Sequence, residues 1–271
     1  MNMKNETASI IMAAGRGSRM KGYSGNKTLL PLIPEDSPYS GRRPILVNLF
    51  SNLPEGPKAI IVNHCKDDVV QTVRGFETTF CDQPILNGTG GAILAAQSFI
   101  QEQACLHFVI TMGDVPFVKK ETYARMVGLL SENDIVILGF RPEDKKKYGV
   151  LEIESGSVTK ITEWKYWKDY PLDRQNALSI CNSGIYAVTK KALETYLPIL
   201  ASRPQIVTKE IDGRMTDIEE FFITDLIEYM VADGRSVGYM VTDSELETMG
   251  IDDPEALKTA QQIYREEGAS S

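Results

Sequence analysis

Short apolar segments alternate with longer amphipathic segments along most of the chain. The short segments have the length of strands, and their near-continuous hydrophobicity is typical of strands covered on both faces. The strands predicted in this way are residues 9–13, 59–63, 108–112 and 135–140. Helical spacing of apolar residues predicts helices at residues 45–52, 91–101, 120–130, 191–200, 218–231 and 254–265. The alternation favours an α/β fold with a mostly parallel sheet.

The second half of the chain carries a different pattern. Residues 150–153 and 158–161 are apolar segments on either side of a Glu-Ser-Gly-Ser turn, which predicts an antiparallel hairpin and therefore a mixed sheet. Residues 22–44 are rich in Gly, Pro and Ser and longer than a usual connection, so we expect a functional or mobile loop there. No repeat or linker divides the chain, and we expect one domain, residues 1–271.

Composition narrows the classes of partner. The 271 residues are 42% hydrophobic and 24% charged, as in globular proteins, and 29 basic against 37 acidic residues give a net charge of −8. This charge argues against nucleic acid or an anionic membrane as a partner. A polar N-terminus, no long apolar run, and four dispersed cysteines that we expect to be reduced thiols predict a cytoplasmic protein.

A glycine-rich turn follows the first predicted strand. Residues 13–20 read Ala-Ala-Gly-Arg-Gly-Ser-Arg-Met, and such turns hold phosphates with backbone N–H groups. The dinucleotide fingerprint would need a third glycine in place of Met20, and the phosphate loop of NTPases would need glycine directly before Lys27. Both motifs are therefore excluded.

Four cations nevertheless gather in and just after this turn, at Arg16, Arg19, Lys21 and Lys27. In a chain of net charge −8, this cluster is typical of a polyphosphate site. Solvated basic residues around a structural glycine turn are the alternative interpretation.

Two further segments carry polar residues where ligands bind in α/β folds. The apolar strand before Gly113 ends abruptly at Asp114, which predicts a carboxylate at the carboxyl edge of the sheet; beside phosphates it would need Mg²⁺. Residues 87–92, Asn-Gly-Thr-Gly-Gly-Ala, precede a helix, so their backbone is free to lie against a base or ribose, with Thr89 as a helix cap. An ordinary turn and simple capping would explain the two segments equally well.

In this order the motifs resemble the sugar-1-phosphate nucleotidyltransferases, most closely the uridylyltransferase (pyrophosphorylase) domains that act on N-acetylglucosamine 1-phosphate. The resemblance spans nearly the whole chain. The segments that carry it are residues 12–20 with Lys27, Gln83 with 88–92, 113–117, 148–149, 162–165, 182–184, 221–225 and 250–253.

The resemblance implies a Rossmann-like mixed sheet flanked by helices, of the nucleotide-diphospho-sugar transferase (GT-A-like) type, with a nucleotide-binding half at 1–117 and an acceptor-binding half at 118–271. It implies Mg²⁺-dependent transfer of a nucleotidyl group to a sugar 1-phosphate, with release of pyrophosphate. The implied catalytic residues are Arg19, Lys27 and Asp114, and the implied metal ligands are Asp114 and Asp252. The implied nucleotide-binding residues are Ala13, Ala14, Gly15, Gly17, Ser18, Gln83, Gly88 and Thr89, and the implied acceptor-binding residues are Gly149, Glu163, Asn182 and Thr224.

The sequence departs from the family pattern at several positions. Met112 replaces a tyrosine, Gly91 a histidine and Asp252 a metal-binding asparagine, and the loop at 28–44 is longer. The extra stretch 166–179 follows Trp164, so the acceptor pocket is expected to differ from that for N-acetylglucosamine 1-phosphate. The chain carries no hexapeptide repeat, so acetyl transfer is not expected, and the sequence leaves the oligomeric state open.

Several functional readings remain open at the level of sequence. Gln83 offers a donor and an acceptor to a pyrimidine edge, which makes UTP the first choice, followed by dTTP or CTP. One rival is a cytidylyltransferase whose non-sugar acceptor has a cationic head group stacked on Trp164. Another is a non-catalytic, nucleotide-binding regulatory protein, since fold does not fix activity.

Overall fold

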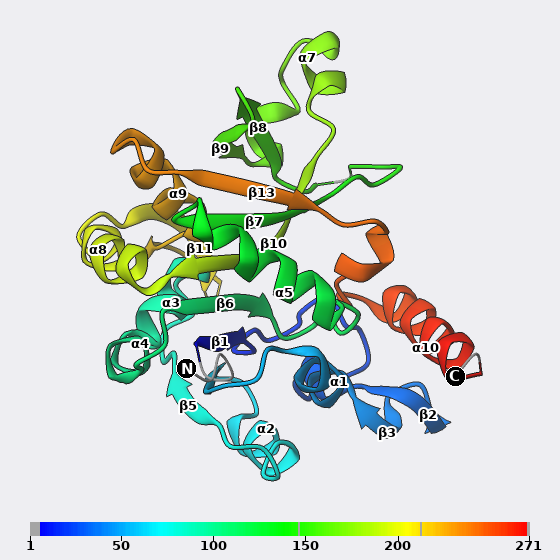
Figure 1. Cartoon of the computed structure of the whole chain (residues 1–271). Coiled ribbons are helices and arrows are strands. Elements are labelled where there is room, and N and C mark those ends of the chain that lie inside the picture. The colour runs from blue at the N-terminus through cyan, green and yellow to red at the C-terminus, as the bar shows by residue number, and fades with distance from the viewer. Residues whose placement is uncertain (1–5, 146, 212, 270–271) are drawn as a thin grey trace.

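The computed structural model describes residues 6–145, 147–211 and 213–269 (Figure 1). Its strands are β1 (Thr7–Met12), β2 (Pro31–Ser37), β3 (Ser40–Pro44), β4 (Lys58–Val62), β5 (Thr79–Asp82), β6 (His107–Met112), β7 (Ile135–Phe140), β8 (Val150–Glu154), β9 (Ser157–Thr162), β10 (Cys181–Thr189), β11 (Gln205–Ile211), β12 (Arg214–Glu220) and β13 (Val237–Val241). Its α-helices are α1 (Ile45–Asn52), α2 (Lys66–Thr72), α3 (Gly88–Ala95), α4 (Gln97–Glu102), α5 (Lys120–Gly128), α6 (Trp164–Trp167), α7 (Leu172–Ala177), α8 (Lys190–Ala201), α9 (Ile223–Ala232) and α10 (Pro254–Ala269). Short 3-10 helices are η2 (Lys27–Leu29), η3 (Leu129–Ser131) and η4 (Glu245–Thr248).

One large mixed sheet organises the molecule. Its strand order is β13-β7-β10-β6-β1-β4-β5, and the β8–β9 hairpin joins it through β10. The pairs β1–β6, β1–β4, β4–β5 and β7–β13 are parallel, while β10 runs antiparallel to both β6 and β7. The expected fold class, a mostly parallel Rossmann-like sheet, is therefore confirmed.

Helices cover both faces of this sheet (Figure 1). One buried apolar cluster joins the sheet to α3, α4, α8 and α9, and a second joins the opposite side chains of the same strands to α1, α2 and α5. Every residue of β1 and β7 is buried, as their continuous hydrophobicity predicts. The four predicted strands and the predicted hairpin are all present, within one or two residues of their expected ends.

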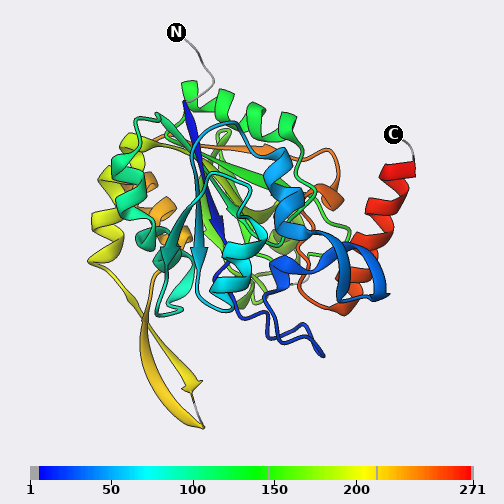
Figure 2. The same ribbon diagram turned by 90° about the horizontal axis from the view of Figure 1, so that it is seen from below.

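The helix predicted at 218–231 is wrong in its first turn. Residues 214–220 instead form β12, which pairs with β11 in an antiparallel hairpin, and α9 begins only at Ile223. Figure 2 shows this hairpin, which we call the arm (β11 and β12), extending away from the sheet and its helices. Cross-strand pairing holds the backbone extended as far as Glu220, which local helical periodicity could not reveal.

The irregular loop predicted at 22–44 is also largely wrong. It contains η2 and the β2–β3 hairpin, which packs against α10 through a third apolar cluster that includes Leu30, Leu32 and Leu257 (Figure 1). The Gln261 side chain of α10 donates hydrogen bonds to the carbonyl oxygens of Pro31 and Pro38, at 2.9 and 2.8 Å. The C-terminal helix thus orders a segment that has too little apolar surface to fold alone.

Two smaller findings complete the comparison with the expected elements. The helix expected at 91–101 is divided at Ala96 into α3 and α4. The four cysteines are free thiols, of which Cys81, Cys105 and Cys181 are buried, in agreement with the prediction. Over the described ranges, the search for an apolar helix of membrane-spanning length finds none.

Candidate active site

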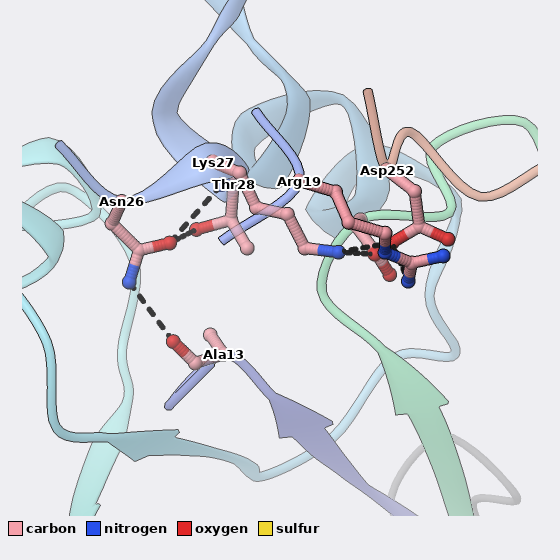
Figure 3. Close-up of polar contacts among 7 residues, drawn as sticks. Ala13, Arg19, Asn26, Lys27, Thr28 and Asp252 are labelled. Atoms are coloured by element: carbon pink, nitrogen blue, oxygen red, sulfur yellow. Dashed lines mark hydrogen bonds and ion pairs between the residues drawn. The ribbon is translucent and has the colours of Figure 1, made fainter. Parts of the chain in front are cut away.

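Four charged side chains from distant parts of the chain meet at the carboxyl end of the central strands. The Lys27 ammonium donates to Asp114 Oδ2 and to Asp252 Oδ1, the latter at 2.7 Å (Figure 3). Arg19 forms an ion pair with the same Asp252 oxygen at 2.8 Å. The Lys27 and Asp114 side chains are 15% and 7% exposed, so this contact lies inside the protein. All four residues are ones that the resemblance implied.

Local structure explains how Lys27 reaches this position. Gly17 has a φ of +61°, and a Cβ there would lie 3.3 Å from Lys27 Cβ, so glycine lets the turn pass close beside the lysine. The fully buried Asn26 accepts hydrogen bonds from the backbone N–H and hydroxyl of Thr28, which caps η2, and donates to Ala13 O at 2.9 Å. Asn26 therefore fixes Lys27 against the end of β1.

Asn26 is a functional residue that sequence reasoning missed. An asparagine two residues before a threonine, at the start of a helical turn, is nevertheless a capping signal that could have identified it.

Asp252 is carried to the site by the segment before α10. The Ile251 N–H donates to Asp114 O at 3.0 Å, and the Ile251 side chain is fully buried against α10 and β2 residues. One backbone hydrogen bond thus joins the two carboxylate-bearing segments directly. The third apolar cluster holds that junction in place.

Electrostatics keep Lys27 charged, and the two carboxylates beside it suit a divalent cation. Burial alone would lower the pKa of Lys27, but Asp114 and Asp252 outweigh it and raise the pKa above its ordinary value. Among the described residues, no group of three or more His, Cys, Asp or Glu side chains could hold a metal. Two carboxylates that converge beside a phosphate site nevertheless fit Mg²⁺, which commonly takes one or two carboxylates and completes its shell with substrate oxygens and water.

A cavity of about 370 Å³ opens beside these charges. At one end lie Lys27 and Asp114; further along lie Ala13, Ala14 and Gly15 of the glycine-rich turn, with Gln83, Gly88 and Thr89. We call it the nucleotide cavity. The arm adds Lys209 and the buried Glu220, which form an ion pair with each other. Nothing in the sequence signalled these two residues, because the arm itself was not predicted.

Gln83 presents a single free group to the nucleotide cavity. Its Nε2 donates to Asn87 Oδ1 at 3.1 Å and to Gly88 O at 3.2 Å, which occupies both of its N–H groups. The carbonyl oxygen Oε1 remains available as an acceptor. Gln83 is therefore not the combined donor and acceptor that its residue type suggests.

Thr89 also differs from the expectation. It lies inside the first turn of α3, whose cap position is Asn87, and does not cap that helix. Its hydroxyl accepts a hydrogen bond from the N–H of Ile223, the first residue of α9, at 3.2 Å. Gly88, with φ +91°, allows the close approach, since a Cβ there would lie 2.4 Å from Phe221 O. These contacts join the base of the arm to the nucleotide cavity.

A second cavity, of about 1050 Å³, adjoins the first, and we call it the acceptor cavity. Met12, Thr89, Met112 and Phe222 line both. The acceptor cavity contains all four of the expected acceptor residues: Gly149, Glu163, Asn182 and Thr224. Partial burial of the Glu163 carboxyl group in the cavity wall raises its pKa, with Lys165 opposing the shift.

Not every expected nucleotide residue lies in a cavity wall. Gly17, Ser18 and Arg19 line neither cavity, and Ser18 is exposed. Asp252 also lies outside both walls and contacts the site through Lys27 and Arg19. The structure thus separates residues that form cavity walls from those that only touch the charged group at the edge of the nucleotide cavity.

Trp164 lies in the acceptor cavity, but two lysines of the protein already lie over its ring. The ammonium groups of Lys147 and Lys168 each lie 5.0 Å from the centre of its ring. A cationic head group would have to displace them. The expected stacking of such an acceptor on Trp164 therefore loses its support.

The chain is similar to known proteins over most of its length. The family model described as the MobA-like NTP transferase domain matches residues 9–193. The matched region contains the glycine-rich turn, Lys27, Asp114 and much of the acceptor cavity. It does not extend to the arm or to Asp252.

The relatives include the bifunctional protein GlmU of Francisella tularensis subsp. novicida, which is 28% identical over 261 residues. That alignment covers 94% of this chain and 51% of the relative, so the chain spans about half the length of the curated relative it matches.

Two solved structures share the fold. One, from Entamoeba histolytica, has the proposed identity of a UDP-N-acetylglucosamine pyrophosphorylase; it has a TM-score of 0.70 at 16% identity and covers 94% of this chain and 79% of its own. The other, from Bacillus anthracis, has the proposed identity of a glucose-1-phosphate thymidylyltransferase; it has a TM-score of 0.67 at 19% identity and covers 96% of this chain and 95% of its own.

Proposed function

The chain belongs to the family of MobA-like NTP transferase domains and is a nucleotidyltransferase, and on this premise we propose its reaction. It joins a nucleoside triphosphate, UTP by preference, to a sugar 1-phosphate similar to N-acetylglucosamine 1-phosphate. The products are a nucleotide sugar and pyrophosphate. The structure proposed as a UDP-N-acetylglucosamine pyrophosphorylase supports this choice of substrates.

One observation carries the proposal. The Lys27, Asp114, Asp252 and Arg19 group lies at the edge of a nucleotide-sized cavity, and that cavity adjoins a larger one containing Glu163 and Asn182. Two anionic substrates placed in these cavities would meet beside Lys27. The arrangement suits direct transfer, because phosphoryl-type reactions depend mainly on positioning and on neutralising charge.

Each residue has a role in this reaction. An oxygen of the acceptor phosphate attacks the α-phosphorus of the triphosphate, a new P–O bond forms, and the bond to the departing pyrophosphate breaks. Lys27 contacts the α-phosphate and the acceptor phosphate, and Arg19 contacts the β- and γ-phosphates. Glu163 and Asn182, with the backbone of Gly149, hold acceptor hydroxyls. Each contact that strengthens as charge develops lowers the barrier.

Asp114 and Asp252 are the residues that would hold Mg²⁺. When bound there, the cation supplies positive charge to the oxygens of the triphosphate and its leaving group. Lys27 lies between the same two carboxylates, and so binds them when they carry no metal.

The choice of base rests on Gln83. With both of its N–H groups engaged, its Oε1 accepts the ring N–H that uracil and thymine carry and that cytosine lacks. UTP and dTTP are therefore favoured over CTP.

The proposed halves of the domain follow the same division. Most of the nucleotide cavity comes from residues before 118, and most of the acceptor cavity from residues after 146, while Lys209, Glu220 and Phe222 cross over to the nucleotide cavity. The cytoplasmic location remains a prediction, to which the four free cysteines add support.

Pyrophosphate release tests the proposal. The purified protein is assayed with Mg²⁺ over a grid of UTP, dTTP, CTP, GTP and ATP against sugar 1-phosphates, phosphocholine and aminoethylphosphonate. We expect a signal with UTP and a hexose or hexosamine 1-phosphate that disappears on chelation. Asp114→Asn serves as the inactive control.

The other outcomes are equally informative. A signal only with CTP and a non-sugar phosphate would replace the sugar acceptor with an amino-alcohol acceptor. Tight nucleotide binding without turnover of any acceptor would favour the regulatory alternative.

A further inference from the structure

The acceptor cavity is larger than one sugar monophosphate requires. Its volume is about 1050 Å³, against about 370 Å³ for the nucleotide cavity. Pockets that enclose a whole drug-sized ligand commonly measure about 300–1,000 Å³. The residues proposed to hold acceptor hydroxyls, Gly149, Glu163 and Asn182, account for only part of its wall.

The rest of the wall has a different chemistry. It comes from β9, α6 and the loop before β8, and it carries Lys147, Lys165, Trp164 and Tyr166. Lys147 and Lys168 lie 5.0 Å from the centre of the Trp164 ring, and Lys165 lies 4.7 Å from that of Tyr166. The buried Trp167 anchors α6 by donating from Nε1 to Tyr148 O at 2.8 Å. These residues thus form a structured edge of the cavity.

The three lysines of this edge differ from other lysines of the two cavities. Lys27, Lys160 and Lys209 each form an ion pair with a carboxylate. Lys147, Lys165 and Lys168 lie over aromatic rings and form no ion pair within the described part of the chain, although the charge of Lys165 also acts on the pKa of Glu163 and of Asp225. We call these three the lysine edge. Three ammonium groups without a direct ion pair among the described residues, in a chain of net charge −8, are open to an anion from outside.

Two carboxylates of the same cavity are bound to other partners. Asp225 accepts from Gln205 Nε2 at 2.7 and 2.8 Å, and Glu228 pairs with Lys160 at 3.2 Å. Glu163 lies next to Gly149, at the part of the wall assigned to acceptor hydroxyls. Asp169 is the remaining carboxylate near α6, against three lysines.

We propose that the lysine edge is a second anion subsite of the acceptor cavity, and that the acceptor carries a carboxylate or a phosphate in addition to its reacting phosphate. This inference rests on the proposed function, because it assigns the second charge to a sugar 1-phosphate. Lys147 and Lys165 bind the second anion from the cavity wall, and Lys168 adds to the local positive charge. The aromatic rings hold the ammonium groups in place before the acceptor arrives.

Two sugar phosphates with a second anion serve as probes. Glucose 1-phosphate is compared with glucuronic acid 1-phosphate, which adds a carboxylate, and with glucose 1,6-bisphosphate, which adds a phosphate. We expect a KM about tenfold lower for at least one doubly charged acceptor, with kcat little changed, because a few partly exposed ion pairs together contribute that much. The preference should shrink as salt rises.

Variants connect the preference to these lysines. The double variant Lys147→Met with Lys165→Met should remove the tenfold preference. Lys147→Met alone, which leaves the charge of Lys165 beside Glu163 in place, should weaken the preference without changing the KM for glucose 1-phosphate. Lys191→Met is the matched control, since it removes an exposed lysine of α8 that lines neither cavity. Loss of preference in the double variant alone supports the subsite.

Tryptophan fluorescence measures binding without turnover. The chain has two tryptophans, and Trp167 is buried, so titration with glucose 1,6-bisphosphate should change the emission of Trp164, and Trp164→Phe should remove that change. Turnover of sugar 1-phosphates without a preference that depends on Lys147 and Lys165 would overturn the subsite and leave the proposed function intact. Binding that depends on these lysines, without turnover of any sugar phosphate, would support the anion subsite and overturn the proposed function. If neither turnover nor lysine-dependent binding is observed, the proposed function and the anion subsite are both overturned.

Discussion

Lys27 is held by two carboxylates that also have a proposed role in binding metal. Its side chain is 15% exposed and its ammonium group contacts Asp114 and Asp252, which Arg19 also contacts, so the four side chains carry no net formal charge. If Asp114 and Asp252 hold a cation, Lys27 would be free to contact phosphate oxygens. The same lysine would therefore stabilise the free enzyme and act in the reaction.

Replacing Lys27 with methionine tests both roles. Without the ammonium group, the facing carboxylates of Asp114 and Asp252 lose their partner, and we expect stability in the absence of metal to fall by about 1–3 kcal/mol. Added Mg²⁺ should restore part of it, because the cation binds only the folded protein. We expect kcat to fall about 100- to 1000-fold in the presence of Mg²⁺. Thermal unfolding with and without Mg²⁺, and initial rates, measure the two effects.

Lys21→Met is the matched control, since it removes an exposed lysine a few residues away that has no carboxylate contact in the described ranges. The Lys21 variant should change neither the stability nor kcat. Near wild-type turnover in the Lys27 variant would disprove the assignment of Lys27 to the reaction.

Glu163 makes stability depend on pH. Partial burial raises its pKa above the ordinary value of 4.5, so the folded state holds the proton more tightly than the unfolded state. The wild type therefore loses stability as pH rises through 4.5 towards the raised pKa, and the loss persists above it. Glu163→Gln should be more stable than the wild type at pH 7, and the difference should disappear below about pH 4.5.

Urea unfolding at pH 4 and pH 7 measures this difference, and the KM for the acceptor should rise in the same variant. A variant less stable than the wild type at pH 7 would contradict the raised pKa.

Among the structural elements, the segment between η4 and α10 links the C-terminal helix to the charged group. Ile251 is fully buried, and its N–H donates to Asp114 O at 3.0 Å, directly beside Asp252. Ile251→Ala should reduce stability by about 2–5 kcal/mol, as other large-to-small core substitutions do. The space left by the shortened side chain loosens the segment that carries Asp252. The Mg²⁺ concentration for half-maximal activity should therefore rise about tenfold.

Ile100→Ala provides the comparison, because Ile100 is equally buried in α4, away from the charged group. It should cost similar stability without a change in the Mg²⁺ requirement. An equal rise in both variants would show that Asp252 is not specifically positioned by Ile251.

The elements that were predicted and those that were missed are stabilised by different contacts. β1, β6 and β7 are buried on both faces, so their sequences are apolar throughout and visible without any partner. The strands of the arm owe their conformation to pairing with each other, and their residues are largely exposed and polar. The β2–β3 hairpin likewise depends on α10, more than 200 residues away in sequence, through Gln261.

The site residues also fall into a group that the sequence predicts and a group that it does not. Arg19, Lys27 and Asp114 follow from residue type and order beside predicted strands, and the structure brings all three together with Asp252. Lys209 and Glu220 reach the nucleotide cavity only because the arm folds back to Gly88 and Gly90 through Phe221 O. Such contacts depend on tertiary packing, which periodicity does not encode.

At the scale of the whole molecule, charge is distributed unevenly. The net charge is −8, yet the cations assigned to phosphates lie at one end of the sheet and the lysine edge lies along the adjoining cavity. Anionic substrates therefore approach a negative protein through local positive regions. Salt should weaken the binding of both substrates more than it affects the chemical step.

The two cavities form one continuous site in which both substrates can be bound together. They share Met12, Thr89, Met112 and Phe222, and no serine, cysteine or histidine is among the residues that line the nucleotide cavity. Its two threonine hydroxyls are engaged: Thr28 donates to Asn26 Oδ1 at 2.8 Å, and Thr89 accepts from Ile223 N at 3.2 Å. The wall's lysines and carboxylates are held in ion pairs, so among the described residues it offers no unengaged nucleophile for a covalent nucleotidyl intermediate.

Transfer should therefore occur in one displacement within a ternary complex. A single in-line attack inverts the configuration at the α-phosphorus, whereas two successive displacements would retain it. With a chiral α-thiotriphosphate as substrate, we expect inversion, and labelled pyrophosphate should not enter the triphosphate unless acceptor or nucleotide sugar is present. Retention, or exchange of pyrophosphate in the absence of acceptor, would require a covalent intermediate and would show that a group outside the nucleotide cavity wall enters the reaction.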